Sequence, residues 1–348
     1  MHINNLFQIT CNNNASDLHL MMGEPPVIRI NGDLKRMENQ SILEKKEMED
    51  LIFSILSPIQ KEKFIKEREL DISYEIKGIG RFRVNLHFEK NNIGLAARVI
   101  PEKIPSMEDI LMPPIAYELT QRSKGLVLVT GPTGCGKSTT LAAMINLINN
   151  ERTCNIITLE DPIEFLFKSE KSIIKQRQLG TDMLSFHTAL KHTLRQDPDV
   201  IMIGEMRDLE TIATTITLAE TGHLVLGTLH TYNAAQTVDR IIDIFPPHQQ
   251  GQIRIQLSMV LVAVISQQLL PKINGEGQVA AREILINTPA VANLIRENKV
   301  AQIKTVIQTG AKDQMISLDQ DLKRLYQEGS ISKENAQIRM ENPEFLTN

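Results

Sequence analysis

The pattern of hydrophobic and polar positions differs between two parts of the chain. In the first hundred residues, short runs that alternate polar with apolar residues are separated by turn residues. This pattern predicts strands at residues 27–30, 71–76 and 81–88, because side chains alternate between the two faces of a strand. Residues 44–56 instead place their apolar side chains at helical spacing, so a helix is expected there. Together these elements predict a small α+β domain over residues 1–100.

Prolines mark the end of this domain. Between residues 101 and 115 the chain contains Pro101, Pro105, Pro113 and Pro114. Prolines at this density break regular structure and stiffen the chain. We therefore expect a proline-rich linker over residues 101–115 and a second domain over residues 116–348.

Continuous apolar runs replace the alternation after the linker. They occupy residues 126–130, 155–159, 200–203 and 224–229. Segments of helix length separate them, which is typical of buried parallel strands with helices on both faces. The second domain is therefore predicted to be of the α/β class.

The last third of the chain is expected to be mostly helical. Residues 255–270 are apolar but too short and too polar for a bilayer span of roughly 20 residues, so a buried helix is expected there. A helical C-terminal part is predicted from about residue 289, with helices over residues 289–297, 300–309, 318–328 and 332–337.

Composition and charge exclude several classes of protein. The 348 residues include 38 basic and 42 acidic side chains, which gives a net charge of −4. Because the phosphate backbone attracts basic surfaces, no direct contact with nucleic acid is expected. The isolated cysteines Cys11, Cys135 and Cys154 form neither a disulfide framework nor a four-cysteine zinc site. The polar N-terminus lacks a signal-peptide pattern, so a cytoplasmic protein is expected.

The most specific motif is a phosphate-binding loop. Residues 131–138 match G-x-x-x-x-G-K-[ST] between a predicted strand and a predicted helix. Its glycines let backbone N–H groups approach a phosphate, Lys137 reaches the β- and γ-oxygens, and the Ser138 hydroxyl ligates Mg²⁺. Cys135 is interpreted as a small residue in a serine-sized site rather than as a redox switch, because no resolving cysteine accompanies it. The motif predicts that ATP and Mg²⁺ are bound by Gly131, Pro132, Thr133, Gly134, Cys135, Gly136, Lys137, Ser138 and Thr139.

Acidic residues follow two of the predicted parallel strands. Glu160 and Glu164 follow the second apolar run, and Glu205 follows the third. Ligands of open parallel sheets lie at the carboxyl ends of strands, and hydrolysis needs a carboxylate that positions or activates water. Helix capping or surface charge is the alternative for each acid, and all three remain candidates for the general base. We favour Glu164 for water activation and Glu205 for Mg²⁺ binding and water positioning, although Gly204 stands where a Walker B strand usually has aspartate.

Two histidines lie at the two ends of the fourth apolar run. His223 precedes it and His230 follows it, so roughly 23 Å separate them and one metal cannot bind both. His230, at the carboxyl end, is a candidate for sensing the γ-phosphate. His223 is interpreted as a structural residue or as a contact to a neighbouring molecule.

Arg81, Arg83 and Arg98 cluster on predicted strands of the first domain. An arginine supplied by a neighbouring subunit can complete the site of a P-loop ATPase. The alternative, that these arginines only face solvent, is equally compatible with the sequence.

Seven motifs taken together resemble one family. They are residues 15–20 (ASDLHL), 80–85 (GRFRVN), 131–139, 160–164, 194–208, 222–230 and 294–299. This combination is similar to the secretion ATPases of type II secretion and type IV pili, most closely to their pilus-retraction (twitching-motility) members. Cys135 in place of the usual serine, and Asn298 in the last motif, are the departures from the family pattern.

The resemblance implies an architecture and a function. It implies a RecA-like P-loop ATPase core with a smaller α+β PAS-like N-terminal domain and a helical C-terminal extension. It implies a homohexamer in which Arg81, Arg83 and Arg98 of one subunit complete the ATP site of the next. ATP hydrolysis would then drive pilus disassembly through an inner-membrane platform protein, with the ATPase at the inner face of the cytoplasmic membrane.

Members that extend pili generally carry a further N-terminal domain and a four-cysteine zinc module. The sequence shows neither, so zinc is not expected and retraction is favoured over extension. A retraction paralogue remains an alternative, as does a DNA-transport or other secretion ATPase on the same core.

Overall fold

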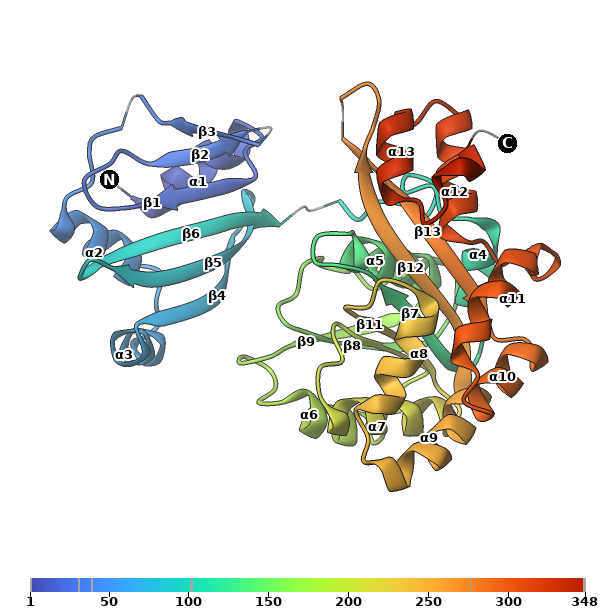
Figure 1. The fold of residues 1–348 in the computed structure, drawn as a ribbon. Helices are drawn as coiled ribbons and strands as arrows, with labels where there is room; N and C mark the ends of the chain where they lie inside the picture. The colour runs from blue at the N-terminus through green and yellow to red at the C-terminus, as the bar shows by residue number, and fades with distance from the viewer. Residues whose placement is uncertain (1, 31, 39, 101–102, 276, 347–348) are drawn as a thin grey trace. The chain divides into compact units, whose positions relative to one another are not determined.

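The computed structural model divides the chain into two units (Figure 1). The first comprises Met1–Lys103 together with the short segment Pro162–Leu166, and the second comprises Ile104–Asp161 and Phe167–Asn348. The structure describes residues 2–30, 32–38, 40–100, 103–275 and 277–346. None of the helices in these described ranges is both long and apolar enough to cross a membrane.

A six-stranded antiparallel sheet forms the frame of the first unit. Its strand order is β3-β2-β1-β6-β5-β4, so β6 joins the N-terminal strands to the later hairpin. The strands are β1 (Asp17–Leu20), β2 (Val27–Ile30), β3 (Asp33–Arg36), β4 (Glu69–Ile76), β5 (Gly80–Glu89) and β6 (Asn92–Ile100). The helices are α1 (Ile3–Asn12), α2 (Lys45–Phe53) and α3 (Pro58–Glu67). The three strands and the helix expected here are confirmed.

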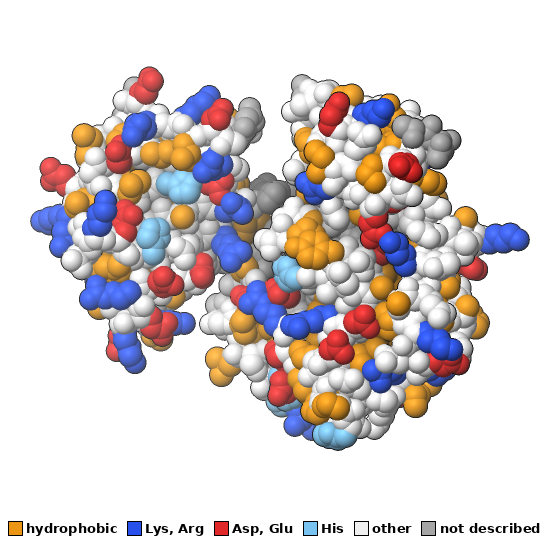
Figure 2. All heavy atoms as spheres, in the orientation of Figure 1, with side chains coloured by type: hydrophobic (Ala, Val, Ile, Leu, Met, Phe, Trp, Pro, Cys, Tyr) orange, Lys and Arg blue, Asp and Glu red, His pale blue; other side chains and the backbone are white. Residues whose placement is uncertain are grey.

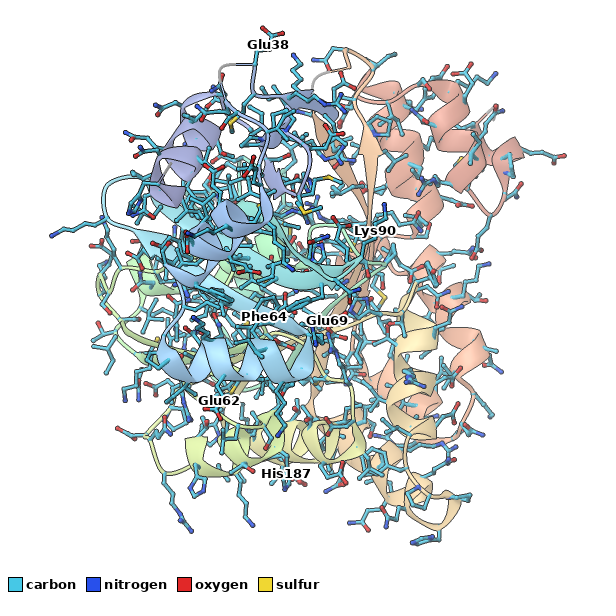
Figure 3. All side chains as sticks on the ribbon, turned by 90° about the vertical axis from the view of Figure 1, so that its left-hand side faces the viewer. Glu38, Glu62, Phe64, Glu69, Lys90 and His187 are labelled. Atoms are coloured by element: carbon cyan, nitrogen blue, oxygen red, sulfur yellow. The ribbon has the colours of Figure 1, made fainter. Side chains whose placement is uncertain are left out.

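The three helices pack on one face of this sheet, and the other face is polar. Along β5 the burial alternates, so that Phe82 is fully buried while its neighbour Arg83 is exposed. The ring of Phe82 packs on Phe7 of α1, with 4.3 Å between the ring centroids. In Figure 3, Phe64 lies on the side of α3 that faces the strands, and Glu62 lies on the opposite side. The alternation leaves the arginines of β5 on the outward face.

The second unit contains a seven-stranded sheet in the order β13-β12-β7-β11-β10-β8-β9. All neighbouring strands are parallel except β12 and β13, which are antiparallel. The strands are β7 (Gly125–Thr130), β8 (Asn155–Glu160), β9 (Ile173–Gln178), β10 (Val200–Ile203), β11 (Leu224–Leu229), β12 (Leu261–Pro271) and β13 (Gln278–Ile286). The predicted α/β class with a parallel sheet is confirmed, and all four expected strands are present.

Helices cover both faces of this sheet. Leu126 and Leu128 of β7 pack in the core under α6 to α9, while Val127 and Val129 pack in the core under α4 and α5. The helices are α4 (Pro114–Thr120), α5 (Lys137–Glu151), α6 (Phe186–Thr193), α7 (Leu209–Glu220), α8 (Ala234–Asp243), α9 (Pro247–Val260), α10 (Pro289–Arg296), α11 (Ile303–Thr309), α12 (Leu318–Gln327) and α13 (Lys333–Arg339). A strand buried on both faces is apolar throughout, which explains the continuous runs in the sequence.

The expectation of a helix over residues 255–270 is wrong in its second half. Helix α9 ends at Val260, and the chain continues as β12 from Leu261. Ala263, Val264 and Ile265 are buried between β7 and β13, and the β-branched side chains of Val264 and Ile265 favour the strand because they pack well in a sheet. The mostly helical region accordingly starts after β13, and helices α10 to α13 match those expected there.

The segment that enters the second unit is held by a buried arginine. Of the expected linker, residues 101 and 102 lie outside the described residues, and Ile104 and those that follow belong to the second unit. Arg282 of β13 donates hydrogen bonds to the carbonyl oxygens of Ile110 (2.7 Å) and Leu111 (2.9 Å). Burial lowers the pKa of Arg282 to about 10. The strand β13 therefore anchors the chain just before α4.

Candidate active site

The phosphate-binding loop connects β7 to α5 and depends on glycine conformation. Gly131 has φ 142° and Gly136 has φ 86°, both in the region that L side chains rarely adopt. A Cβ on Gly131 would also lie 2.3 Å from the carbonyl oxygen of Gln267. Gly136 is the N-cap of α5, so no capping side chain competes for the first amides of that helix. These amides form an anion-binding helix N-terminus.

The lysine of the loop is folded over the loop backbone. Lys137 is buried, and its Nζ donates to the carbonyl oxygens of Gly131 (2.8 Å) and Pro132 (3.0 Å). This places the ammonium group above the glycines, where the loop would hold a phosphate. Ser138 and Thr133 are exposed, so the Ser138 hydroxyl in the first turn of α5 is accessible to a ligand. The remaining positions of the motif are Gly134, Cys135 and Thr139.

Cys135 is a packing residue of the loop. It is 3% exposed, and burial raises the pKa of its thiol, an effect that the charge of nearby Lys137 only partly offsets. The thiol is therefore protonated at neutral pH and is a poor nucleophile. This agrees with the interpretation of Cys135 as a small residue that fills the site.

Gln267 of β12 braces the loop and was not singled out from the sequence. Its Nε2 donates to the carbonyl oxygen of Cys135 (2.7 Å), and its Oε1 accepts from the Thr140 hydroxyl (3.0 Å). Gln267 is 2% exposed, so both hydrogen bonds are shielded from water. The sequence did not indicate this contact. It depends on Gln267 lying on a strand that pairs with β7, whereas a helix was expected over residues 255–270.

The three acidic candidates occupy different environments. Glu160 ends β8 and is buried, and its Oε1 accepts from the Thr158 hydroxyl (2.6 Å) and from Gln176 (3.1 Å). Glu164 is exposed and belongs to the segment Pro162–Leu166 of the first unit. Glu205 follows the end of β10, which lies two strands from β7 in the sheet. Glu160 and Glu205 are thus at neighbouring strand ends, since β8 and β10 pair in parallel.

Glu205 makes two charge-assisted contacts. Its Oε1 lies 3.1 Å from His230 Nε2, and its Oε2 lies 2.7 Å from a guanidinium nitrogen of Arg207. Burial raises the pKa of Glu205, but the hydrogen bond from Arg207 and the charge of His230 outweigh it, so the pKa lies below its usual value. Glu205 therefore contacts His230, which the sequence predicted as a site residue, and Arg207, which lies in motif 194–208 but was not predicted as one.

The second histidine has a local structural contact. His223 Nδ1 lies 2.9 Å from the carbonyl oxygen of Leu218 and 3.2 Å from the Thr221 hydroxyl. It precedes β11, whereas His230 follows the same strand. The two histidines therefore lie at opposite ends of β11, as the spacing predicted, and His223 stabilises the turn after α7.

The three candidate arginines share the outward face of the first unit's sheet. Arg83 of β5 and Arg98 of β6 are direct cross-strand partners, and Arg81 lies two residues from Arg83 on β5. The Arg98 Nε donates to Asp17 Oδ1 at 2.9 Å, and Arg29 of β2 approaches the other oxygen of that carboxylate at 3.8 Å. Basic and histidine side chains on the surface of this unit are visible in Figure 2. Arg83 and Arg98 therefore lie in one row across the strands with Asp17 and Arg29, and Arg81 lies at the next outward position along β5.

A pocket of about 580 Å³ adjoins Glu205 in the second unit. Glu205, Arg207 and Asp161 line its polar side, and Leu179 and Phe186 line its apolar side. His187 of α6, which is labelled in Figure 3, also lines this pocket.

Comparisons with known proteins agree with this geometry. Residues 106–347 match the profile of the type II/IV secretion system protein family. The chain is 48% identical to the type IV pilus retraction ATPase PilT of Pseudomonas aeruginosa, over 99% of each chain. It is 39% identical to the type IV pilus ATPase PilU of the same organism, over 97% of this chain and 88% of that protein.

A crystal structure of the pilus retraction motor PilT with bound ADP superposes with a TM-score of 0.94 and 44% identity, covering 100% of this chain and 99% of that one. The resemblance noted in the sequence and the expected fold class are thereby confirmed. The chain belongs to the type II/IV secretion system protein family, and it is a nucleotide-binding ATPase with a RecA-like core.

Proposed function

We propose that this protein is a motor of type IV pilus retraction that hydrolyses ATP with Mg²⁺. One observation carries the proposal: the phosphate loop and the Glu205–His230 pair lie at the carboxyl ends of parallel strands in one sheet, in a chain that matches PilT of P. aeruginosa over 99% of its length. The higher identity to PilT (48%) than to PilU (39%) favours PilT over its paralogue as the counterpart.

The loop residues bind the phosphates of ATP. The glycine amides and the N-terminus of α5 cradle the phosphate oxygens, and Lys137 exchanges its contacts to loop carbonyls for contacts to the β- and γ-phosphates. Ser138 and Glu205 are oxygen donors at the same edge of the sheet, which is the donor set that Mg²⁺ prefers. A bound Mg²⁺ neutralises charge that develops on the transferred phosphoryl group.

Glu164 is the proposed general base for the attacking water. Glu160 is a weaker candidate, because it is buried and its Oε1 already accepts two hydrogen bonds. Glu164 is exposed and therefore accessible to water. Glu205 positions water and metal, with His230 as its partner and as the sensor of the γ-phosphate.

The active form is proposed to be a homohexamer in which Arg81, Arg83 and Arg98 enter the neighbour's site. Their shared position on the outward face of a sheet makes them available to a second subunit. Mixing Lys137→Ala subunits with Arg83→Ala subunits should restore ATP turnover. A Lys137→Ala subunit still supplies an intact Arg83 to the intact phosphate loop of an Arg83→Ala neighbour. Arg36→Ala, on the same sheet but paired with Glu24, is the control that keeps turnover. No recovery on mixing would contradict action in trans.

The motor is proposed to act on an inner-membrane platform protein at the cytoplasmic face of the membrane, without direct nucleic-acid contact. Imaging of labelled pili tests this directly. Cells with Lys137→Ala should extend pili but not retract them, while Lys124→Ala, an exposed lysine before β7, should retract normally. Normal retraction combined with defective DNA transfer in Lys137→Ala cells would instead support the DNA-transport alternative.

A further inference from the structure

The backbone around Glu205 is fixed from both sides. The Gly204 N–H donates to the Leu159 carbonyl oxygen of β8 (2.8 Å), and the Met206 N–H donates to the Thr228 carbonyl oxygen of β11 (3.1 Å). Glu205 lies between these two anchors. Movement of its carboxylate therefore comes from rotation of the Glu205 side chain and not from movement of the backbone.

Both oxygens of that carboxylate are already bound within the protein. Arg207 holds Oε2 at 2.7 Å and His230 lies 3.1 Å from Oε1. The contact with Arg207 is charge-assisted, and such bonds are stronger than neutral ones. A carboxylate in this arrangement has to release a partner before it can turn toward a metal-bound water.

A second carboxylate is available to the guanidinium. The hydrogen bond to Glu205 is the main cause of the raised pKa of Arg207, and the negative charge of Asp161 adds to it. Asp161, Glu205 and Arg207 line the same pocket, and the Arg207 side chain is 66% exposed. The guanidinium therefore has both space to move and an acidic residue toward which it can move.

We propose that Arg207 is a latch: it holds the Glu205 carboxylate in a resting position, and Mg²⁺ binding requires transfer of the guanidinium from Glu205 toward Asp161. The proposal rests on the proposed role of Glu205 at the metal. It makes Arg207 a positioning residue that acts through Glu205. Without nucleotide, the contact between Arg207 and Glu205 opposes metal binding. The Glu205 carboxylate therefore acts on the metal only when nucleotide and Mg²⁺ are both present.

Removing the latch should strengthen metal binding. A partly exposed ion pair contributes about 0.2–1 kcal/mol, which corresponds to an up to about fivefold change in an equilibrium constant. Arg207→Gln keeps most of the side-chain length but removes the charge. We expect it to lower the half-saturating Mg²⁺ concentration by about two- to fivefold. Arg207→Lys, which keeps a charge, should lie between this variant and the wild type.

The experiment is a titration of the purified full-length protein with MgCl₂, followed by the fluorescence of a labelled ADP. Binding of the same ADP in EDTA is measured in parallel. The latch predicts an unchanged affinity in EDTA and a lower half-saturating Mg²⁺ concentration for Arg207→Gln. Arg195→Gln, which changes an exposed arginine elsewhere in this unit, should match the wild type in both measurements.

Three outcomes would overturn the latch. An unchanged half-saturating Mg²⁺ concentration in Arg207→Gln would show that the ion pair does not oppose metal binding, and an increased one would show that Arg207 assists it. Weaker ADP binding in EDTA would show that Arg207 contacts the nucleotide or supports the fold of the site. Glu205→Gln separates the two hypotheses: if it leaves the Mg²⁺ requirement unchanged, the proposed metal role of Glu205 fails, whatever Arg207 does.

Discussion

The brace between Gln267 and the phosphate loop leads to a quantitative prediction. In the variant Gln267→Met, a side chain of similar length and volume replaces the amide, so no large cavity forms. The substitution removes the hydrogen bonds to the Cys135 carbonyl (2.7 Å) and from the Thr140 hydroxyl (3.0 Å). Because Gln267 is only 2% exposed, water has little access to the two groups that lose their partner.

An unsatisfied buried donor or acceptor costs about 1–3 kcal/mol. Two such groups, with some relaxation of the loop, should lower the free energy of unfolding by about 2–4 kcal/mol. The two lost hydrogen bonds also hold the phosphate loop in the conformation that binds phosphate. Since each 1.4 kcal/mol is a tenfold change in affinity, ADP binding should weaken by about tenfold or more.

Urea denaturation followed by circular dichroism measures the first effect, because the chain has no tryptophan for fluorescence. Titration of a fluorescent ADP measures the second. Gln268→Ala is the matched control, since Gln268 is the next residue of β12 and contacts the exposed Arg339. It should change both quantities little. Wild-type stability and ADP affinity in Gln267→Met would refute the idea that β12 braces the loop.

Arg282→Met should lower the free energy of unfolding by about 2–4 kcal/mol, because the carbonyl groups of Ile110 and Leu111 before α4 lose a buried partner. Urea denaturation measures this change, and a value below about 0.5 kcal/mol would contradict the anchoring role. Burial raises the pKa of Asp17, but hydrogen bonds from Ser16 and Arg98 outweigh this and lower it below the usual value of an aspartate, so the ionised form stabilises the fold at neutral pH. Asp17→Asn should therefore reduce stability by about 1 kcal/mol at pH 7, and the difference from the wild type should shrink as the pH falls through the folded-state pKa; a difference independent of pH would contradict this. His223→Ala should keep ATP turnover within about twofold, whereas His230→Ala should lower it at least about tenfold; equal losses in a phosphate-release assay would contradict the different roles of the two histidines.

Much of the second unit was predictable because its strands are buried on both faces. Such strands leave continuous apolar runs, and the phosphate loop has a fixed spacing that identifies its neighbours as strand and helix. The apolar run at residues 261–271, in contrast, is ambiguous in the sequence. A short apolar run fits either a buried helix or a strand, and only pairing with β7 and β13 decides between them.

The site was predictable where a residue lies just after the end of a strand. Glu205 and His230 follow β10 and β11, and parallel pairing of these strands brings the two side chains together. Gln267 and Arg207 were missed as site residues for different reasons. The role of Gln267 depends on a long-range contact across the sheet, and that of Arg207 depends on a side-chain rotamer that no spacing rule encodes.

An optical trap that follows single pili tests whether ATP hydrolysis in this site drives pilus retraction. The cells carry either the wild-type protein or Glu164→Gln as their only copy. The wild type should pull the bead against load, and Glu164→Gln should leave pili extended and the bead stationary. Retraction by Glu164→Gln at wild-type speed and force would contradict the assignment of Glu164 and the coupling of this site to retraction.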